Sequence, residues 1–240
     1  MAETLNERQP LACERKWVYL ALMLTGGFYG GYTYTARGGV FCNAQTANFV
    51  LLAMALGRGE WRGALYYLIP MSAYLAGAIL SEAVATPIKR LGLVRWDTLL
   101  VFIEIGAVIL LGFLPETAPP QIAQVTVNFL CSMQYNTFRQ AQDIPMATTF
   151  CTNHVRQVGV GLVHAVRHPE EPRWRRKVLS HLEMLGVFVA GCAASTALSD
   201  RFLGRTIWGA LLPLGIVGGW LLYADLRGER GRLEQVPRGH

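Results

Sequence analysis

The segment Arg37-Gly38-Gly39-Val40-Phe41-Cys42-Asn43-Ala44-Gln45-Thr46-Ala47-Asn48 runs directly into the apolar stretch Phe49–Gly57. Later in the chain, Arg139 is followed by Thr148-Thr149-Phe150-Cys151-Thr152-Asn153-His154. Both segments place amides and hydroxyls beside sequence that is apolar enough for a lipid bilayer. Polar groups at such depth are costly unless they are paired or line a cavity. The recurrence predicts an internally duplicated membrane protein whose working site lies where the two repeats meet.

The hydropathy of the rest of the chain agrees with this interpretation. Hydrophobic residues make up 52% of the 240 residues and charged residues only 16%. Several apolar runs reach the length of roughly 17–25 residues that a helix needs to cross a bilayer. The strong runs are Trp17–Tyr34, Gly63–Thr86, Asp97–Leu114, Gln121–Phe138, Leu179–Leu198 and Thr206–Ala224, and the weaker runs that carry the motifs are Phe41–Gly57 and Pro145–Val166. The runs are apolar all round, whereas helices of a soluble domain have a polar face. The predicted fold is an all-α, polytopic membrane helix bundle of about six spans (six to eight), with an internal repeat of two halves.

Charge placement predicts the topology. If the two motif segments do not cross, Lys and Arg concentrate on the side of both termini, which are then cytoplasmic by the positive-inside rule. If both cross, the termini stay on that side, but Arg156 is left inside a span. Six spans fit better, and the apolar Val50–Leu56 indicates that the first motif segment enters the membrane as a re-entrant or broken helix. The predicted parts are a cytoplasmic segment 1–16, one integral domain 17–224 in the plasma membrane (halves about 17–115 and 116–224), and a cytoplasmic tail 225–240.

The two halves also match outside the motifs. The stretch Leu75–Ser81 aligns with Val189–Ser195, and each half contains a span, a polar motif and two further spans. Three crossings per half would give the halves opposite orientations, which is the recurrent plan of secondary transporters. Four crossings would make the repeats parallel.

The uncharged polar side chains of the motifs are the candidate substrate-binding residues. They are Asn43, Gln45, Thr46 and Asn48 from the first half, and Gln134, Asn136, Thr148, Thr149, Thr152 and Asn153 from the second. Such groups can coordinate a small polar solute or an ion at a broken helix. The alternative is that they hold helices together by hydrogen bonds. Their concentration at two equivalent places favours a site.

Charged residues in or beside the spans are the remaining candidates. Glu104 lies well inside a span and is the candidate for proton coupling, with pairing to an Arg or a backbone amide as the alternative. Arg37 and Arg139 each follow a span, where they anchor an anion or extend to the membrane interface. A lone histidine such as His154 is more often hydrogen-bonded than functional.

Other classes of protein are disfavoured. The five cysteines have no CxxC spacing, and no nucleophile–base pair, phosphate-binding loop or metal signature is present, so we expect no enzyme activity, cofactor or metal. The net charge of +6 is mostly orientation signal, and we expect no nucleic-acid partner. The basic run Arg173–Lys177 is interpreted as a positive-inside flank, with binding of anionic lipid head groups as the alternative.

The first motif resembles that of the YoaK-type family of uncharacterised bacterial multi-pass membrane proteins, which has a Gly-Gly-x-x-x-Asn-Ala-Gln-Thr-Gly-Asn run. In the second half, Met133–Asn136 and Thr148–Asn153 stand where that family has a Gln-Asn motif and a Thr-rich segment. The resemblance covers about residues 17–224 and implies six or seven spans in the plasma membrane, without an agreed activity. Ala47 and Asn153 occupy positions where the family commonly has glycine, so any tight bend there is made differently.

These observations predict a small secondary transporter or permease with its site at the two motifs. Its partners would be the lipid bilayer and a small polar solute or ion. Because the chain is short for alternating access, this prediction includes a homodimer. The alternative is a membrane scaffold, sensor or lipid-binding protein, in which the motifs only join helices.

Overall fold

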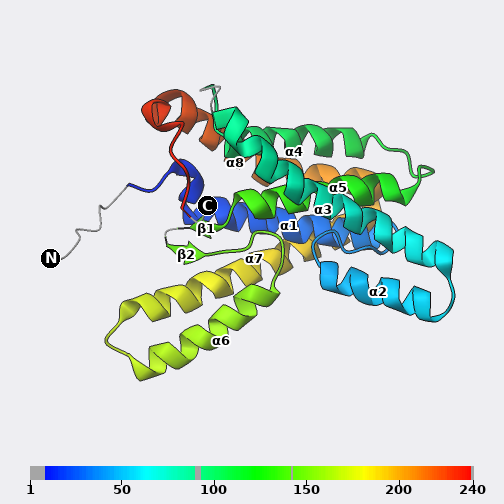
Figure 1. Ribbon diagram of the computed structural model, residues 1–240, viewed down its shortest axis with the longest axis horizontal. Coiled ribbons are helices and arrows are strands. Elements are labelled where there is room, and N and C mark those ends of the chain that lie inside the picture. The colour runs from blue at the N-terminus through cyan, green and yellow to red at the C-terminus, as the bar shows by residue number, and fades with distance from the viewer. Residues whose placement is uncertain (1–8, 90–92, 142, 239–240) are drawn as a thin grey trace.

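The computed structural model describes residues 9–89, 93–141 and 143–238, which form a helix bundle (Figure 1). The α-helices are α1 (Lys16–Thr35), α2 (Gln45–Gly57), α3 (Trp61–Lys89), α4 (Trp96–Gly112), α5 (Pro120–Thr137), α6 (Thr152–Arg167), α7 (Pro172–Phe202) and α8 (Leu211–Tyr223). Shorter helical turns are η1 (Ala12–Glu14), η2 (Leu203–Ala210), η3 (Ala224–Gly228) and η4 (Arg230–Arg232). Strands β1 (Gln140–Ala141) and β2 (Ile144–Pro145) pair in antiparallel register.

The helices follow the apolar runs of the sequence, so the all-α prediction is confirmed. Pro120 lies at the start of α5 and Pro172 at the start of α7, where the missing N–H of proline costs no helical hydrogen bond. Two helical stretches, Trp61–Ala85 and Pro172–Gly228, are long and apolar enough to cross a membrane by length and composition. The weaker motif-bearing runs form shorter helices, because α2 begins at Gln45 and α6 only at Thr152.

Two helix pairs hold the bundle together, and both are built on glycine. Helix α1 packs against α7, and α3 packs against α5. A Cβ added at Gly27 would lie 2.1 Å from the carbonyl oxygen of Phe188, and one added at Gly77 would lie 2.5 Å from that of Phe129. Only glycine permits such close backbones, which is how small residues pack helices in membranes. The helix order in the two pairs is reciprocal, because each joins the first helix of one half to the third helix of the other.

Helices α1 and α5 run in opposite directions. The hydroxyl of Tyr19, near the start of α1, donates to the carbonyl of Gln140, just beyond the end of α5, at 2.7 Å. At the other end, Gln124 near the start of α5 donates to the carbonyl of Arg37, beyond the end of α1, at 2.6 Å. In Figure 1, the α2–α3 hairpin lies toward one end of the bundle and the α6–α7 hairpin toward the other.

The bundle buries polar side chains beside its hydrophobic core and exposes many large apolar side chains. Asn48, Asn128 and Gln134 have no exposed surface, whereas Leu110 and Leu212 are each 73% exposed. A water-soluble surface rarely carries so many large apolar side chains side by side. The interior therefore combines a hydrophobic core with buried polar groups, and much of the perimeter is apolar.

The described terminal segments, residues 9–15 and 224–238, lie together at one end of the bundle, where they form a polar cap (Figure 1). The backbone N–H of Ala12 donates to Glu229 at 2.7 Å, and that of Arg95 donates to Asp225 at 2.9 Å. The Arg95 side chain pairs with Asp97 at 3.2 Å. Burial raises the pKa of Asp225 and of Glu229 above their ordinary values, although the N–H donors act in the opposite direction.

Candidate functional site

The two polar motifs meet beside Gly26, halfway along α1. The Nδ2 of Asn43 donates to the Gly26 carbonyl at 2.9 Å. A Cβ added at Gly26 would lie only 2.5 Å from the carbonyl oxygen of Thr148. Residues of both motifs thus contact one position on α1, although they lie far apart in the sequence.

The first motif reaches this depth because the chain reverses after α1. Gly38 and Gly39 adopt φ values of +80° and +74°, which side-chain-bearing residues rarely adopt. The side chain of Asn48 then closes the returning loop, because its Oδ1 accepts from Phe41 N at 3.2 Å and its Nδ2 donates to Phe41 O at 2.6 Å. Helix α2 begins at the bottom of this loop and returns toward the end of the bundle. The backbone of the first motif therefore enters the bundle and then turns back in α2.

A cavity of about 540 Å³ lies between the starts of α2 and α6, and we call it the central cavity. It is lined by Phe41, Asn43, Ala44, Gln45, Thr46, Tyr74, Phe150, Cys151, Thr152 and Phe188. None of these side chains is formally charged at neutral pH. Neither helix has a side-chain cap at its N-terminus, and residues of the first turn of each line the cavity, so the positive dipole end of both helices lies beside it.

The predicted site residues that line the central cavity differ in whether their polar atoms already have hydrogen-bond partners. Gln45 donates to Asn128 Oδ1 at 2.8 Å and accepts from Asn48 at 3.3 Å, so its amide is engaged on both sides. Within the described part of the chain, the hydroxyls of Thr46 and Thr152 and the Oδ1 of Asn43 have no hydrogen-bond partner. These are the groups that a solute could reach.

Two tyrosine–phenylalanine ring pairs border the central cavity. Tyr34, at the end of α1, stacks on Phe41 with ring centroids 4.6 Å apart. Tyr135, at the end of α5, contacts Phe150 edge-on with centroids 4.7 Å apart. Both phenylalanines precede a cysteine in the repeated motif and both line the cavity. The two halves therefore place the same type of aromatic contact at corresponding points.

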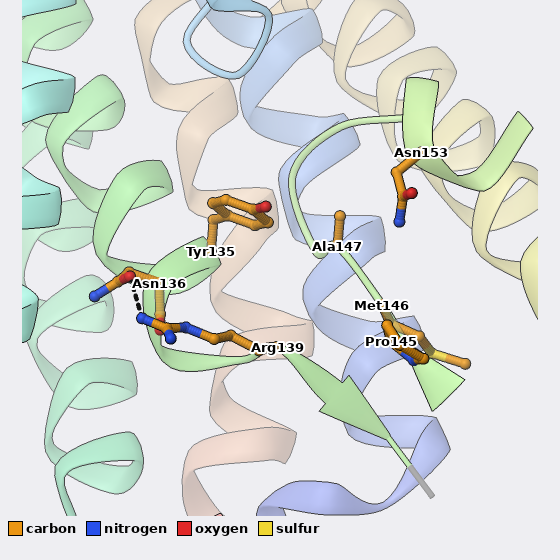
Figure 2. A pocket seen from close by; sticks show the side chains of 7 residues that line it. All are labelled: Tyr135, Asn136, Arg139, Pro145, Met146, Ala147 and Asn153. Carbon is orange, nitrogen blue, oxygen red and sulfur yellow. Dashed lines mark hydrogen bonds between the residues drawn. The ribbon is translucent and has the colours of Figure 1, made fainter. Parts of the chain in front are cut away.

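A second cavity of about 330 Å³ lies beyond the Tyr135–Phe150 contact. Figure 2 shows its lining: the Tyr135 ring is directed toward Ala147, Asn136 and Arg139 are hydrogen-bonded to each other on one side, and Asn153 lies on the other side. Arg139 donates to Glu82 at 3.1 Å, and Asn136 donates to the same carboxylate oxygen at 3.2 Å. The structure thus brings Asn136, Arg139 and Asn153 together in a place separate from the central cavity.

The other polar residues of the second motif are buried between α1 and α5. Gln134 donates weakly to Leu22 O at 3.3 Å and to Thr148 O at 3.4 Å, while its Oε1 has no partner among the described atoms. Thr148 and Thr149 are fully buried. These three side chains support the path of the motif and do not line either cavity.

Arg37 is buried and fully engaged. Its guanidinium donates to Tyr32 Oη at 2.9 Å and to Leu114 O at 3.2 Å, and it lies 3.8 Å from a carboxylate oxygen of Glu116. It therefore holds the linker between α4 and α5 against the end of α1. Arg139, in contrast, borders the second cavity.

Glu104 faces the interior from α4 and has no exposed surface. Its Oε2 lies 3.5 Å from the hydroxyl of Tyr29, and its Oε1 has no hydrogen-bond partner among the described atoms. Glu104 does not line the central cavity, but Tyr29 lies one helical turn beyond Gly26, against which both motifs pack.

Two polar partners were not predicted from the sequence. His154 is not a lone histidine, because its Nδ1 lies 2.8 Å from Nδ1 of His181 on α7, and its Nε2 lies 2.8 Å from the carbonyl of Ala147. Asn128, which binds Gln45, was overlooked inside an apolar run. The signal in the sequence was the spacing of Gln124 and Asn128, which lie four residues apart and therefore on one face of a helix. In the structure the Asn128 side chain also donates to the backbone carbonyl of Gln124.

Metal and redox sites have little support among the described residues. The group with metal-ligand spacing is His168, Glu170 and Glu171, at the exposed turn between α6 and α7. Glu171 already pairs with Arg173, and His168 lies 3.5 Å from Glu170. The five cysteines are free thiols.

The fold and site define an all-α bundle with a polar interior and two motif segments that enter it from opposite ends. The chain belongs to the DUF1275 family, described as a protein family of unknown function, and residues 18–220 match it. No match is found among curated proteins or among solved structures. The prediction that the chain belongs to a family without an assigned function is confirmed.

Proposed function

We propose that this chain is a multi-pass membrane protein that carries a small polar solute through the central cavity. The observation that carries the proposal is that the polar motifs of both halves converge on one cavity beside Gly26, halfway along α1. Transporters with duplicated halves bind their substrates at such a place, where discontinuous helices begin near the middle of the membrane.

The distribution of polar and apolar groups supports a place in the membrane. An apolar perimeter suits hydrocarbon, in which polar side chains are accommodated only in the interior or at a water-filled cavity. In this proposal α1, α3, α4, α5, α7 and α8 cross the bilayer, with η2 extending α8, while α2 and α6 are re-entrant. Both termini and the polar cap lie on one side, which the charge distribution makes cytoplasmic.

The antiparallel course of α1 and α5 supports an inverted repeat. The reciprocal pairs α1–α7 and α5–α3 are what two interlocked, oppositely oriented halves would make. Such halves can rock against each other about a fixed site and expose it first to one side and then to the other.

The two aromatic pairs are the gates of this proposed cycle. Tyr34–Phe41 and Tyr135–Phe150 lie at the ends of oppositely directed helices, so they border the central cavity toward opposite sides of the membrane. The second cavity then serves as the vestibule beyond the Tyr135–Phe150 gate. Loss of one ring contact would open the cavity to one side only.

The lining of the central cavity restricts the solute. It offers the acceptor Oδ1 of Asn43, two threonine hydroxyls, two helix N-termini and four aromatic rings, without a charged side chain. A small solute that has a negatively polarised oxygen for the helix ends and donors for Asn43 would satisfy these groups. Glu104 is buried and has no cationic partner among the described residues, and it is proposed to take up the coupled proton and to act through Tyr29.

The alternative function, a scaffold or sensor that transports nothing, is favoured by one observation. Asn48 and Gln45 are hydrogen-bonded as interhelical or loop-closing groups would be. In that case Thr46 and Thr152 would have no contact with water from either side.

Gate opening tests the proposal. A single cysteine at Thr46, in a background free of the five native cysteines, reports access of membrane-impermeant thiol reagents. Tyr34→Ala is expected to raise labelling from one side of the membrane and Tyr135→Ala from the opposite side. Phe113→Ala is the matched control. Its ring contacts that of Trp208, with ring centroids 5.1 Å apart, and neither residue lines the central cavity. Increased labelling from the same side in both variants, or in neither, would contradict the gates.

A further inference from the structure

A groove of about 600 Å³ lies where the start of α7 meets the turn between β1 and β2, and the proposed transport path does not use it. Three basic side chains, Arg173, Arg176 and Lys177, line it together with Trp174. Asp143 also lines the groove, but its carboxylate pairs with Arg238 of the C-terminal tail. Basic side chains therefore outnumber acidic ones in the lining of the groove.

The aromatic floor of the groove is fixed in place. The ring of Trp174 stacks on His164 of α6, with centroids 4.1 Å apart and planes 13° apart. Arg173 and Lys177 lie over the same ring at 5.0 Å and 5.6 Å from its centroid. Arg173 also pairs with Glu171, whereas the ammonium of Lys177 has no carboxylate partner among the described residues. The ring thus holds two cations close together, and Glu171 compensates only Arg173, so a bound anion would compensate Lys177.

Next to the basic groove, the α6–α7 hairpin presents an apolar face. Val163 and Val166 on α6 are 49% and 80% exposed, and Leu179 and Leu182 on α7 are 59% and 47% exposed. The hairpin lies at the same end of the bundle as the polar cap of the termini (Figure 1). A ligand that fits both features has an anionic head and an apolar body.

We propose that this groove is a binding site for an anionic phospholipid, with the phosphodiester between Arg173, Arg176 and Lys177 and the acyl chains along the apolar face of the hairpin. A positive-inside flank alone requires charge but no groove and no fixed aromatic ring. The adjacent apolar face favours a lipid over a soluble phosphate. The opposite hairpin provides an internal comparison, because Arg58 and Arg62 also flank its turn between α2 and α3 but do not line the basic groove.

Native mass spectrometry of the purified full chain tests the site, with phosphatidylglycerol titrated against phosphatidylcholine. The triple variant Arg173→Gln/Arg176→Gln/Lys177→Gln is expected to lose at least about tenfold in preference for phosphatidylglycerol, since basic residues at an anionic surface contribute individually. Arg58→Gln/Arg62→Gln is the matched control and should bind like the parent. Unchanged thermal unfolding of both variants confirms that they fold.

A second variant separates the groove from charge alone. Trp174→Leu keeps every charge but removes the ring that positions two of them, and we expect a loss of about threefold to tenfold. The proposal is overturned if the triple variant keeps the lipid preference of the parent, or if the control loses as much. It is also overturned if glycerol 3-phosphate, or an acidic peptide, competes as strongly as the lipid.

Discussion

The side-chain amide of Asn43 donates a 2.9 Å hydrogen bond to the backbone carbonyl of Gly26. Gly26 lies halfway along α1, so this bond fixes the first motif at the middle of the bundle. The backbone of Thr148, from the second motif, packs directly against the same glycine. One residue without a side chain is therefore the point where both halves of the site are positioned.

A methyl group at Gly26 should disturb both motifs. In Gly26→Ala the new Cβ would meet the Thr148 carbonyl oxygen at 2.5 Å and the Thr149 Cα at 3.2 Å, and backbone atoms cannot rotate away. We expect a loss of about 1–3 kcal/mol in the free energy of unfolding from overpacking. Gly186→Ala on α7 is the matched control, because nothing lies within 4 Å of its Cβ, and it should be neutral or stabilising. Equal thermal stabilities of the two variants in detergent would argue against this contact.

The residues of the first motif should divide into structural and solute-contacting groups. Gln45→Ala and Asn128→Ala each remove one side of a 2.8 Å hydrogen bond, and a double-mutant cycle should give a coupling of about 0.6–1.7 kcal/mol. Thr46→Ala removes an unpartnered, exposed hydroxyl and should change the stability by less than about 0.5 kcal/mol. A coupling near zero, or a large effect of Thr46→Ala, would reverse these assignments.

Glu104→Gln tests the proposed proton coupling. The amide keeps the shape of the side chain and the contact with Tyr29 but cannot exchange a proton. We expect the variant to fold and to be labelled at the central cavity in the same way with and without a proton gradient. If its labelling still responds to the gradient as in the parent, Glu104 does not couple protons.

The polar cap of the termini should weaken as the pH rises. Because burial raises the pKa of Asp225 and Glu229 in the folded chain, the docked tail binds protons more readily than the free tail. The free energy that these two carboxyl groups contribute to docking of the tail is fully present below the ordinary carboxyl pKa of about 4. It is lost as the pH rises through their raised pKa values. Hydrogen exchange at the Ala12 and Arg95 amides, corrected for intrinsic rates, should slow in mildly acidic solution. Asp225→Asn/Glu229→Gln should abolish this dependence, and protection that increases with pH would refute it.

Hydropathy was sufficient to predict the helices, because their apolar runs are long. The two motif-bearing runs were predicted to begin at Phe41 and Pro145, whereas α2 begins at Gln45 and α6 at Thr152, because hydropathy does not show where the backbone of each motif stops being extended. The partners of these motifs were not predictable. His154 finds His181 on another helix, and Arg37 meets Glu116 only because the linker after α4 returns to the end of α1. Such contacts depend on how the halves interlock, and that arrangement is set by close glycine contacts such as Gly27 with Phe188. The polar residues could be named from the sequence, but their division between two cavities and the buried interior required the fold.

Thiol accessibility at Thr46 and Thr152 tests the central claim most directly. Each is replaced by cysteine in a background without native cysteines, and impermeant reagents are applied from either side of the membrane, with and without a proton gradient. The account predicts labelling at both positions from both sides, with a balance that shifts with the gradient. Absence of labelling from either side in a folded protein would mean that the motifs are buried packing and would contradict transport through the central cavity.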